Sequence, residues 1–132
     1  MRILIVEDDF ISRQIIRGII SPYGKTDIAV DGHEAMEGFV NAWAQKEPYD
    51  LVFMDIMMPG IDGKEALSRI RDMEKDMGVK PGKEVKVIML TALDDPKTVI
   101  ESFLKSGATS YMVKPIDKDG ILNEVRELGL ID

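Results

Sequence analysis

The sequence predicts an α/β protein in which helices cover both faces of one five-stranded parallel sheet with strand order 2-1-3-4-5, a doubly wound fold. Short runs that are apolar throughout alternate with longer segments whose apolar residues recur at helical spacing. Strands without polar alternation are typical of a sheet that is buried on both faces, as parallel sheets are. The predicted strands are residues 3–6, 28–30, 51–54, 87–90 and 111–113.

Five helices are predicted after these strands, because a right-handed crossover helix must join each pair of parallel strands. Their apolar stripes begin at Ile11, Ala35, Ala66, Val99 and Ile121. The first stripe continues through residues 15, 16, 19 and 20. The β-α unit is therefore expected five times.

Several helix starts carry a capping signal. Asp31 and Asp62 each stand three residues before a glutamate, a pattern close to a capping box. Asp95 precedes a proline, which is favoured at the first helical position. We expect Asp9 to cap the first helix, and we expect the charges in residues 69–75 to form a solvated helix face.

The composition is that of a soluble globular domain, with 45% hydrophobic and 31% charged residues in 132. We expect residues 1–132 to form a single domain with no effector domain attached. The sequence has no membrane span, no secretory signal and no cysteine, which fits a reducing cytoplasm. A net charge of −7 argues against direct nucleic-acid binding.

Polar residues follow four of the predicted strands at their carboxyl ends. Glu7 and Asp8 follow the first strand, Asp55 the third, Thr91 the fourth and Lys114 the fifth. In a 2-1-3-4-5 sheet the ligand site lies outside the carboxyl ends, where the strand order reverses. The three acids are therefore expected in one crevice, with the hydroxyl and the amine beside them.

Three neighbouring carboxylates repel each other unless a cation lies among them. Oxygen ligands without histidine or cysteine favour a hard ion, so we expect Mg²⁺, or Mn²⁺ in its place, with the backbone carbonyl of Met57 as a further ligand. Such a site suits phosphoryl transfer, in which Asp55 attacks while the metal and Lys114 neutralise the phosphoryl oxygens. Thr91 would donate a hydrogen bond to one of those oxygens. The Lys114–Pro115 bond is a candidate for cis geometry.

Together these segments resemble the receiver domain of bacterial two-component response regulators, in the CheY-like superfamily, along essentially the whole chain. The resemblance rests on the acidic pair after the first strand, residues 55–63 after the third, Thr91-Ala92 after the fourth and residues 107–115 around the fifth. It implies a stand-alone phosphoacceptor signalling module rather than an enzyme with an external substrate. A sensor histidine kinase or a phosphotransfer protein would donate the phosphoryl group from a phosphohistidine, and an unknown protein would be the target.

The resemblance also assigns roles to single residues. It makes Asp55 the phosphoacceptor, Lys114 the phosphate-binding lysine and the acidic pair the Mg²⁺ ligands. Thr91 would be the switch hydroxyl and Tyr111 the aromatic residue whose rotamer follows it. Their movement would remodel the surface formed by the fourth helix, the fifth strand and the fifth helix. No separate organic cofactor is implied.

Two further positions bear on the lifetime of the phosphorylated form. In the family, the residues two beyond the acceptor and two beyond the switch hydroxyl flank the water that hydrolyses the acyl phosphate. Here they are Met57 and Leu93, and neither side chain can hydrogen-bond to that water. We expect slow self-dephosphorylation.

Other functional classes are less well supported. A Mg²⁺-dependent phosphatase resembling the haloacid dehalogenases needs an acid two residues after its nucleophile, where this chain has Met57. A flavodoxin-like flavin carrier needs a phosphate-binding loop after the first strand, where residues 7–9 are acidic. A scaffold that works without phosphorylation is a third alternative.

Overall fold

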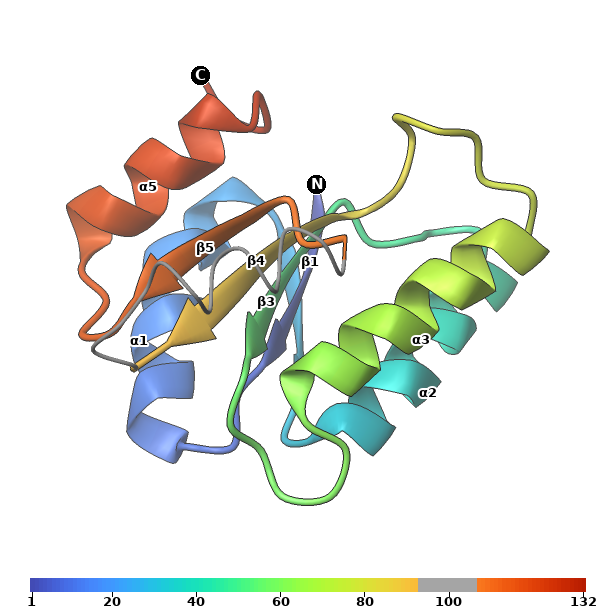
Figure 1. Cartoon of the computed structure of the whole chain (residues 1–132). Helices are drawn as coiled ribbons and strands as arrows, with labels where there is room; N and C mark the ends of the chain where they lie inside the picture. The colour runs from blue at the N-terminus through green and yellow to red at the C-terminus, as the bar shows by residue number, and fades with distance from the viewer. Residues whose placement is uncertain (93–106) are drawn as a thin grey trace.

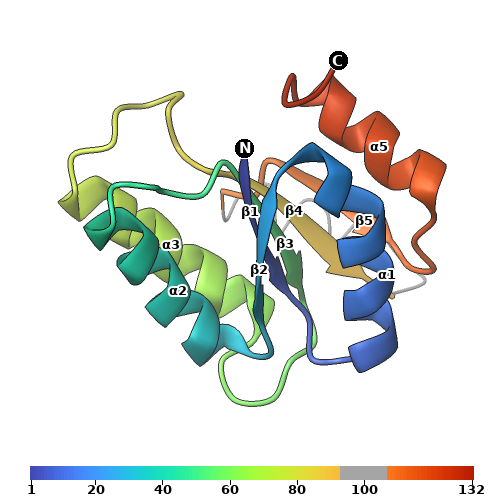
Figure 2. The ribbon, with the colours of Figure 1, turned by 180° about the vertical axis from the view of Figure 1, so that it is seen from behind.

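The computed structural model describes residues 1–92 and 107–132. Helices α1 and α5 cover one face of a central sheet, and α2 and α3 cover the other (Figures 1 and 2). The elements are β1 (Arg2–Val6), α1 (Phe10–Ile20), the 3₁₀ turn η1 (Ser21–Tyr23), β2 (Lys25–Ala29), α2 (Gly32–Ala44), β3 (Leu51–Asp55), α3 (Gly63–Asp76), β4 (Lys86–Thr91), β5 (Ser110–Val113) and α5 (Lys118–Glu127). The helix predicted around Val99 and its start at Asp95 lie outside the described residues.

The sheet has the predicted order, β2-β1-β3-β4-β5, and every neighbouring pair is parallel. The strand β2 runs over Lys25–Ala29 rather than the predicted 28–30. It begins with polar residues because it is an edge strand, and its outer residues are only partly covered. The short apolar run therefore overlaps only the last two residues of the strand, and Val30 lies beyond its end.

The two faces of the sheet carry separate apolar layers. Along β1, Leu4 and Val6 pack toward α2 and α3, whereas Ile3 and Ile5 pack toward α1 and α5. Successive side chains of a strand point to opposite faces, so a strand covered on both faces is apolar at every position. This explains the unbroken apolar runs of the central strands. Within the described ranges, no helix has the length and apolar character needed to cross a membrane.

The first apolar stripe is wider than the buried face of its helix. Ile16 and Ile20 are buried against the sheet, but Ile11 and Ile15 are 67% and 46% exposed. Phe10, at the start of α1, is 63% exposed. The predicted stripe is therefore only partly buried, because α1 contacts the sheet along one side and residues 11 and 15 lie outside that contact.

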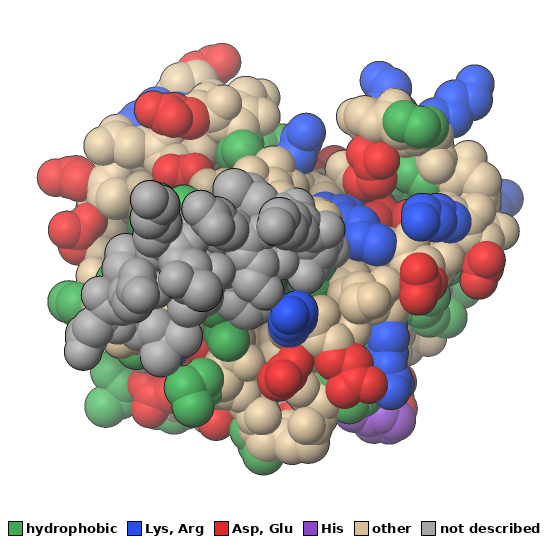
Figure 3. All heavy atoms as spheres, in the orientation of Figure 1, with side chains coloured by type: hydrophobic (Ala, Val, Ile, Leu, Met, Phe, Trp, Pro, Cys, Tyr) green, Lys and Arg blue, Asp and Glu red, His purple; other side chains and the backbone are tan. Residues whose placement is uncertain are grey.

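The expectation of a fully solvated charged face at residues 69–75 was also wrong in part. Glu74 is only 2% exposed, and its carboxylate accepts hydrogen bonds from Arg71 at 2.6 Å and from the Val85 N–H at 2.7 Å. Arg71 also donates to the carbonyl of Gly107. This pair joins α3 to the segments that lead into β4 and β5. On the same side of the molecule as α3, Lys and Arg side chains lie among Asp and Glu side chains on the surface (Figure 3).

A glycine lets the start of α3 approach the end of β3 closely. Asp62 caps α3 by accepting from the Glu65 N–H at 2.8 Å, as predicted. The next residue, Gly63, donates from its N–H to the carbonyl of Ile56 at 3.0 Å. A Cβ atom at Gly63 would overlap the carbonyl oxygen of Asp55. The backbone that carries Asp55 is therefore held in place by a contact that excludes any side chain at residue 63.

This contact predicts opposite effects for two glycine-to-alanine substitutions. Gly63→Ala should lower the free energy of unfolding by about 1–3 kcal/mol, because backbone atoms must move to admit the methyl group. Gly18→Ala, in α1 with no atom within 4 Å of the new Cβ, should raise it by about 0.5–1 kcal/mol through helix propensity. Urea unfolding of both variants measures the difference, and equal effects would contradict the proposed contact.

Candidate functional site

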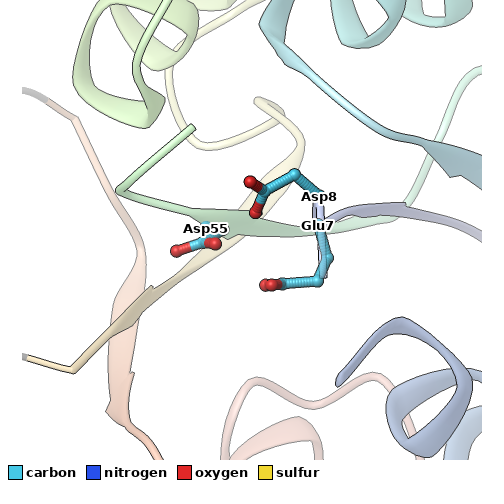
Figure 4. Close-up of side chains that lie close together, drawn as sticks. All are labelled: Glu7, Asp8 and Asp55. Carbon is cyan, nitrogen blue, oxygen red and sulfur yellow. The ribbon is translucent and has the colours of Figure 1, made fainter. Parts of the chain in front are cut away.

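Three carboxylates meet at the carboxyl end of the sheet. One oxygen each from Glu7, Asp8 and Asp55 lies within 4.8 Å of the other two, and the three side chains turn toward a common space (Figure 4). Val6 pairs with Met54, so the residues that follow on β1 and β3 emerge side by side. The structure thus brings together the acids that the sequence predicted.

The three carboxylates differ in their exposure to solvent. Glu7 is fully buried and Asp55 is 5% exposed, whereas Asp8 is exposed. The Met57 N–H donates to Oδ1 of Asp55 at 3.2 Å and so orients that carboxylate. The Met57 side chain is 69% exposed at the mouth of the site. The role of its carbonyl as a ligand stays a prediction.

Lys114 bridges two of the acids. Its Nζ lies 3.1 Å from both carboxylate oxygens of Glu7 and 3.3 Å from Oδ2 of Asp55. The lysine follows β5, and its backbone N–H donates to the carbonyl of Thr91 at 2.7 Å. The Lys114–Pro115 peptide bond, for which the sequence left the isomer open, is cis. An amine from a distant part of the sequence therefore lies among the acids.

Burial and crowding change the protonation of this site. Burial raises the pKa of Glu7 to about 7; the nearby charge of Asp55 acts in the same direction, and the hydrogen bond from Lys114 opposes both. Burial alone would lower the pKa of Lys114, but its bonds with Glu7 and the charge of Asp55 outweigh burial and raise it. Lys114 is therefore a stable cation, but one ammonium group cannot neutralise three carboxylates.

The donor set fits a hard divalent cation. All three acidic groups offer oxygen, the chain has no cysteine, and its single histidine, His33, is exposed on α2 and pairs with Glu37. Mg²⁺ needs few protein ligands because it retains several waters. An exposed Asp8 leaves room for such waters.

The two predicted switch residues lie on β4, which is next to β3, and on β5, which follows β4 in the sheet. Thr91 ends β4 and is 2% exposed; it follows Leu90, the partner of Asp55 across the sheet. Tyr111, on β5, is 37% exposed. Leu93 and the helix expected after it lie outside the described residues, so the structure tests neither the role of Leu93 nor the full switch surface.

Sequence reasoning missed two residues that shape this site. Gly63 was taken only as part of a motif, although it packs against the backbone of Asp55. Arg13 was not singled out, although its guanidinium donates to the carbonyls of Glu7 and Asp8 at 3.1 and 3.4 Å. A positive charge near the start of a helix is unfavourable, so its position was a signal that could have drawn attention to it.

Comparisons with known proteins agree with this geometry. The response regulator receiver domain family matches residues 3–126. The chain is 36% identical to the chemotaxis protein CheY of Treponema pallidum over 126 residues, which are 94% of this chain and 79% of that protein. Three further curated relatives, two of them histidine kinases, are longer, and the chain spans 12%, 9% and 50% of their lengths.

Solved structures of receiver domains have the same fold. CheY of Borrelia burgdorferi, in a complex with CheX, BeF₃⁻ and Mg²⁺, superimposes with a TM-score of 0.83 at 29% identity, covering 98% of this chain and 89% of that one. The receiver domain of Ssk1 from Saccharomyces cerevisiae, in a complex with the phosphotransfer protein Ypd1, gives 0.82 at 30% identity, with 98% and 88% covered. With its sheet order, its acidic cluster and a family match over nearly all of its length, this chain belongs to the response regulator receiver domains.

Proposed function

We propose that the chain is a phosphorylation-controlled signalling module and that Asp55 accepts the phosphoryl group. The observation that carries this proposal is the position of Lys114, whose Nζ contacts both Glu7 and Asp55 where three carboxylates converge. An ammonium group at this point can neutralise the oxygens of an incoming phosphoryl group. The donor would be a phosphohistidine of a sensor kinase or a phosphotransfer protein, as the Ypd1 complex with the receiver domain of Ssk1 suggests.

In the transfer itself, an oxygen of Asp55 forms a bond to phosphorus as the bond between phosphorus and the donor imidazole nitrogen breaks. The electron pair of that bond returns to the imidazole, which leaves as the neutral ring because its other nitrogen carries a proton. The Met57 N–H holds Oδ1 of Asp55 in place, and Lys114 interacts with the phosphoryl oxygens. Glu7, Asp8 and Asp55, with the Met57 carbonyl, would hold Mg²⁺ or Mn²⁺, which supplies further charge neutralisation. Asp55 itself takes the group, so the chain would catalyse only its own phosphorylation and dephosphorylation.

The signal would pass from Asp55 through Thr91 to Tyr111. The phosphoryl group adds a charge of about −1.5 to −2 and three strong acceptors, and the Thr91 hydroxyl would donate to one of them. A shift of Thr91 would make room for the half-exposed ring of Tyr111 and change the surface of β5 and α5. The phosphoryl group would favour one of two packings, to the extent that it binds that packing better. Output would be through protein contacts, because the net charge of −7 opposes binding to nucleic acid.

The acceptor assignment can be tested with a small phosphodonor such as acetyl phosphate. Intact mass spectrometry should show one phosphoryl adduct on the wild type in Mg²⁺, little adduct in chelator and none on Asp55→Asn. Asp62→Asn is the matched control, because asparagine also caps helices, and it should be phosphorylated normally. An adduct on Asp55→Asn would contradict the assignment, and steady phosphate release from an external ester would favour the phosphatase.

We expect the Met57 side chain to limit the rate at which the phosphoryl group on Asp55 is hydrolysed. Met57→Asn places a hydrogen-bonding group at the mouth of the site, where it can orient the attacking water, and should speed loss of the phosphoryl group by about tenfold. The same exchange at Met77, an exposed methionine at the end of α3, should change nothing. Time courses by intact mass after removal of the donor give both rates. Equal lifetimes would show that Met57 does not limit hydrolysis.

A further inference from the structure

Arg13 occupies a place that helix energetics disfavour. It is the fourth residue of α1, and the first turn of this helix contains no acidic residue. The amino end of a helix carries a partial positive charge, so a cation there costs stability unless another interaction offsets the cost. Such a local conflict is expected where a residue serves a function.

The contacts of Arg13 show what offsets this cost. One guanidinium nitrogen donates to the carbonyl of Glu7 at 3.1 Å and, more weakly, to that of Asp8 at 3.4 Å. The guanidinium carbon lies 5.4 Å from the centroid of the Phe10 ring, within the range of a cation–π contact. Arg13 therefore folds back from α1 onto the backbone of the two acids that follow β1.

This backbone needs a restraint. Glu7 and Asp8 are adjacent in the chain and, with Asp55, direct three like charges toward one space. Glu7 is held by burial and by Lys114, but Asp8 is exposed and has little packing to fix it. A single donor that binds both carbonyls fixes the peptide planes, and with them the direction of both side chains.

We propose that Arg13 is a positioning residue for the cation site, and that it holds Glu7 and Asp8 so that both carboxylates face Asp55. The inference rests on the proposed function, since it explains how the acidic pair is kept ready to bind Mg²⁺. Arg13 contacts backbone carbonyls and not the reacting atoms. Removal of a group that orients metal ligands typically weakens metal binding by about tenfold or more.

The direction in which a substitution of Arg13 changes the affinity for Mg²⁺ distinguishes a positioning role from a purely electrostatic one. Removal of a positive charge near a Mg²⁺ site strengthens Mg²⁺ binding if charge alone matters. Loss of a positioning contact weakens it. Arg17, exposed in the last turn of the same helix, provides a matched control for the change in net charge.

Isothermal titration with Mg²⁺ alone, on the whole chain at pH 8, tests the proposal. Arg13→Ala should raise the Kd for Mg²⁺ about tenfold, whereas Arg17→Ala should leave it unchanged or lower it. Arg13→Lys keeps the charge but lacks the planar guanidinium, so it should raise the Kd by about two- to threefold. This variant still tests the proposal if circular dichroism shows that Arg13→Ala is unfolded.

Unchanged or tighter Mg²⁺ binding by either folded Arg13 variant would overturn the proposal, and so would a wild type that binds no Mg²⁺. If instead the proposed phosphoacceptor function is wrong, the wild type binds Mg²⁺ but takes up no phosphoryl group from acetyl phosphate. That result does not depend on how tightly the Arg13 variants bind Mg²⁺.

Discussion

The parallel pairing of β1 with β3 is the constraint on which the site depends. Because Val6 lies opposite Met54, the chain cannot form this sheet without placing Glu7 beside Asp55. The repulsion between these acids opposes folding, and the apolar layers on both faces of the sheet outweigh it. The same pairing that completes the core therefore creates a concentrated negative charge at one edge.

Three different contacts hold the three carboxylates in positions from which they can bind one cation. Lys114 reaches across from β5 and neutralises part of their charge. Gly63 allows the start of α3 to pack against the backbone of Asp55, and Arg13 binds the backbone of the acidic pair. Each contact comes from a different part of the fold, so the geometry of the site depends on how α1, α3 and the end of β5 pack against β1 and β3. A site of this kind suits a switch, because a change in its charge acts on several elements at once.

Regular periodicity made most of the fold predictable from the sequence. The central strands are apolar on both faces, and the residues that end them must lie at one edge, so the order of the strands alone is enough to place Glu7, Asp55 and Lys114 together. Edge and flank positions were less predictable: β2 begins among polar residues, and Ile15 is exposed although it continues an apolar stripe. Contacts between side chains and backbone, such as those of Arg13, have no periodicity and depend on distances that only the folded chain defines.

The three carboxylates form one site that can hold a divalent cation. The most direct test is the free energy of unfolding of the wild type and of Asp55→Asn, measured with urea at pH 8, above the pKa of about 7 of Glu7, with and without Mg²⁺. Without Mg²⁺, Asp55→Asn should be more stable than the wild type by about 1 kcal/mol, because one of the repelling charges is removed. Mg²⁺ should stabilise the wild type more than the variant. A variant no more stable than the wild type, together with equal stabilisation of both by Mg²⁺, would contradict a shared cation site.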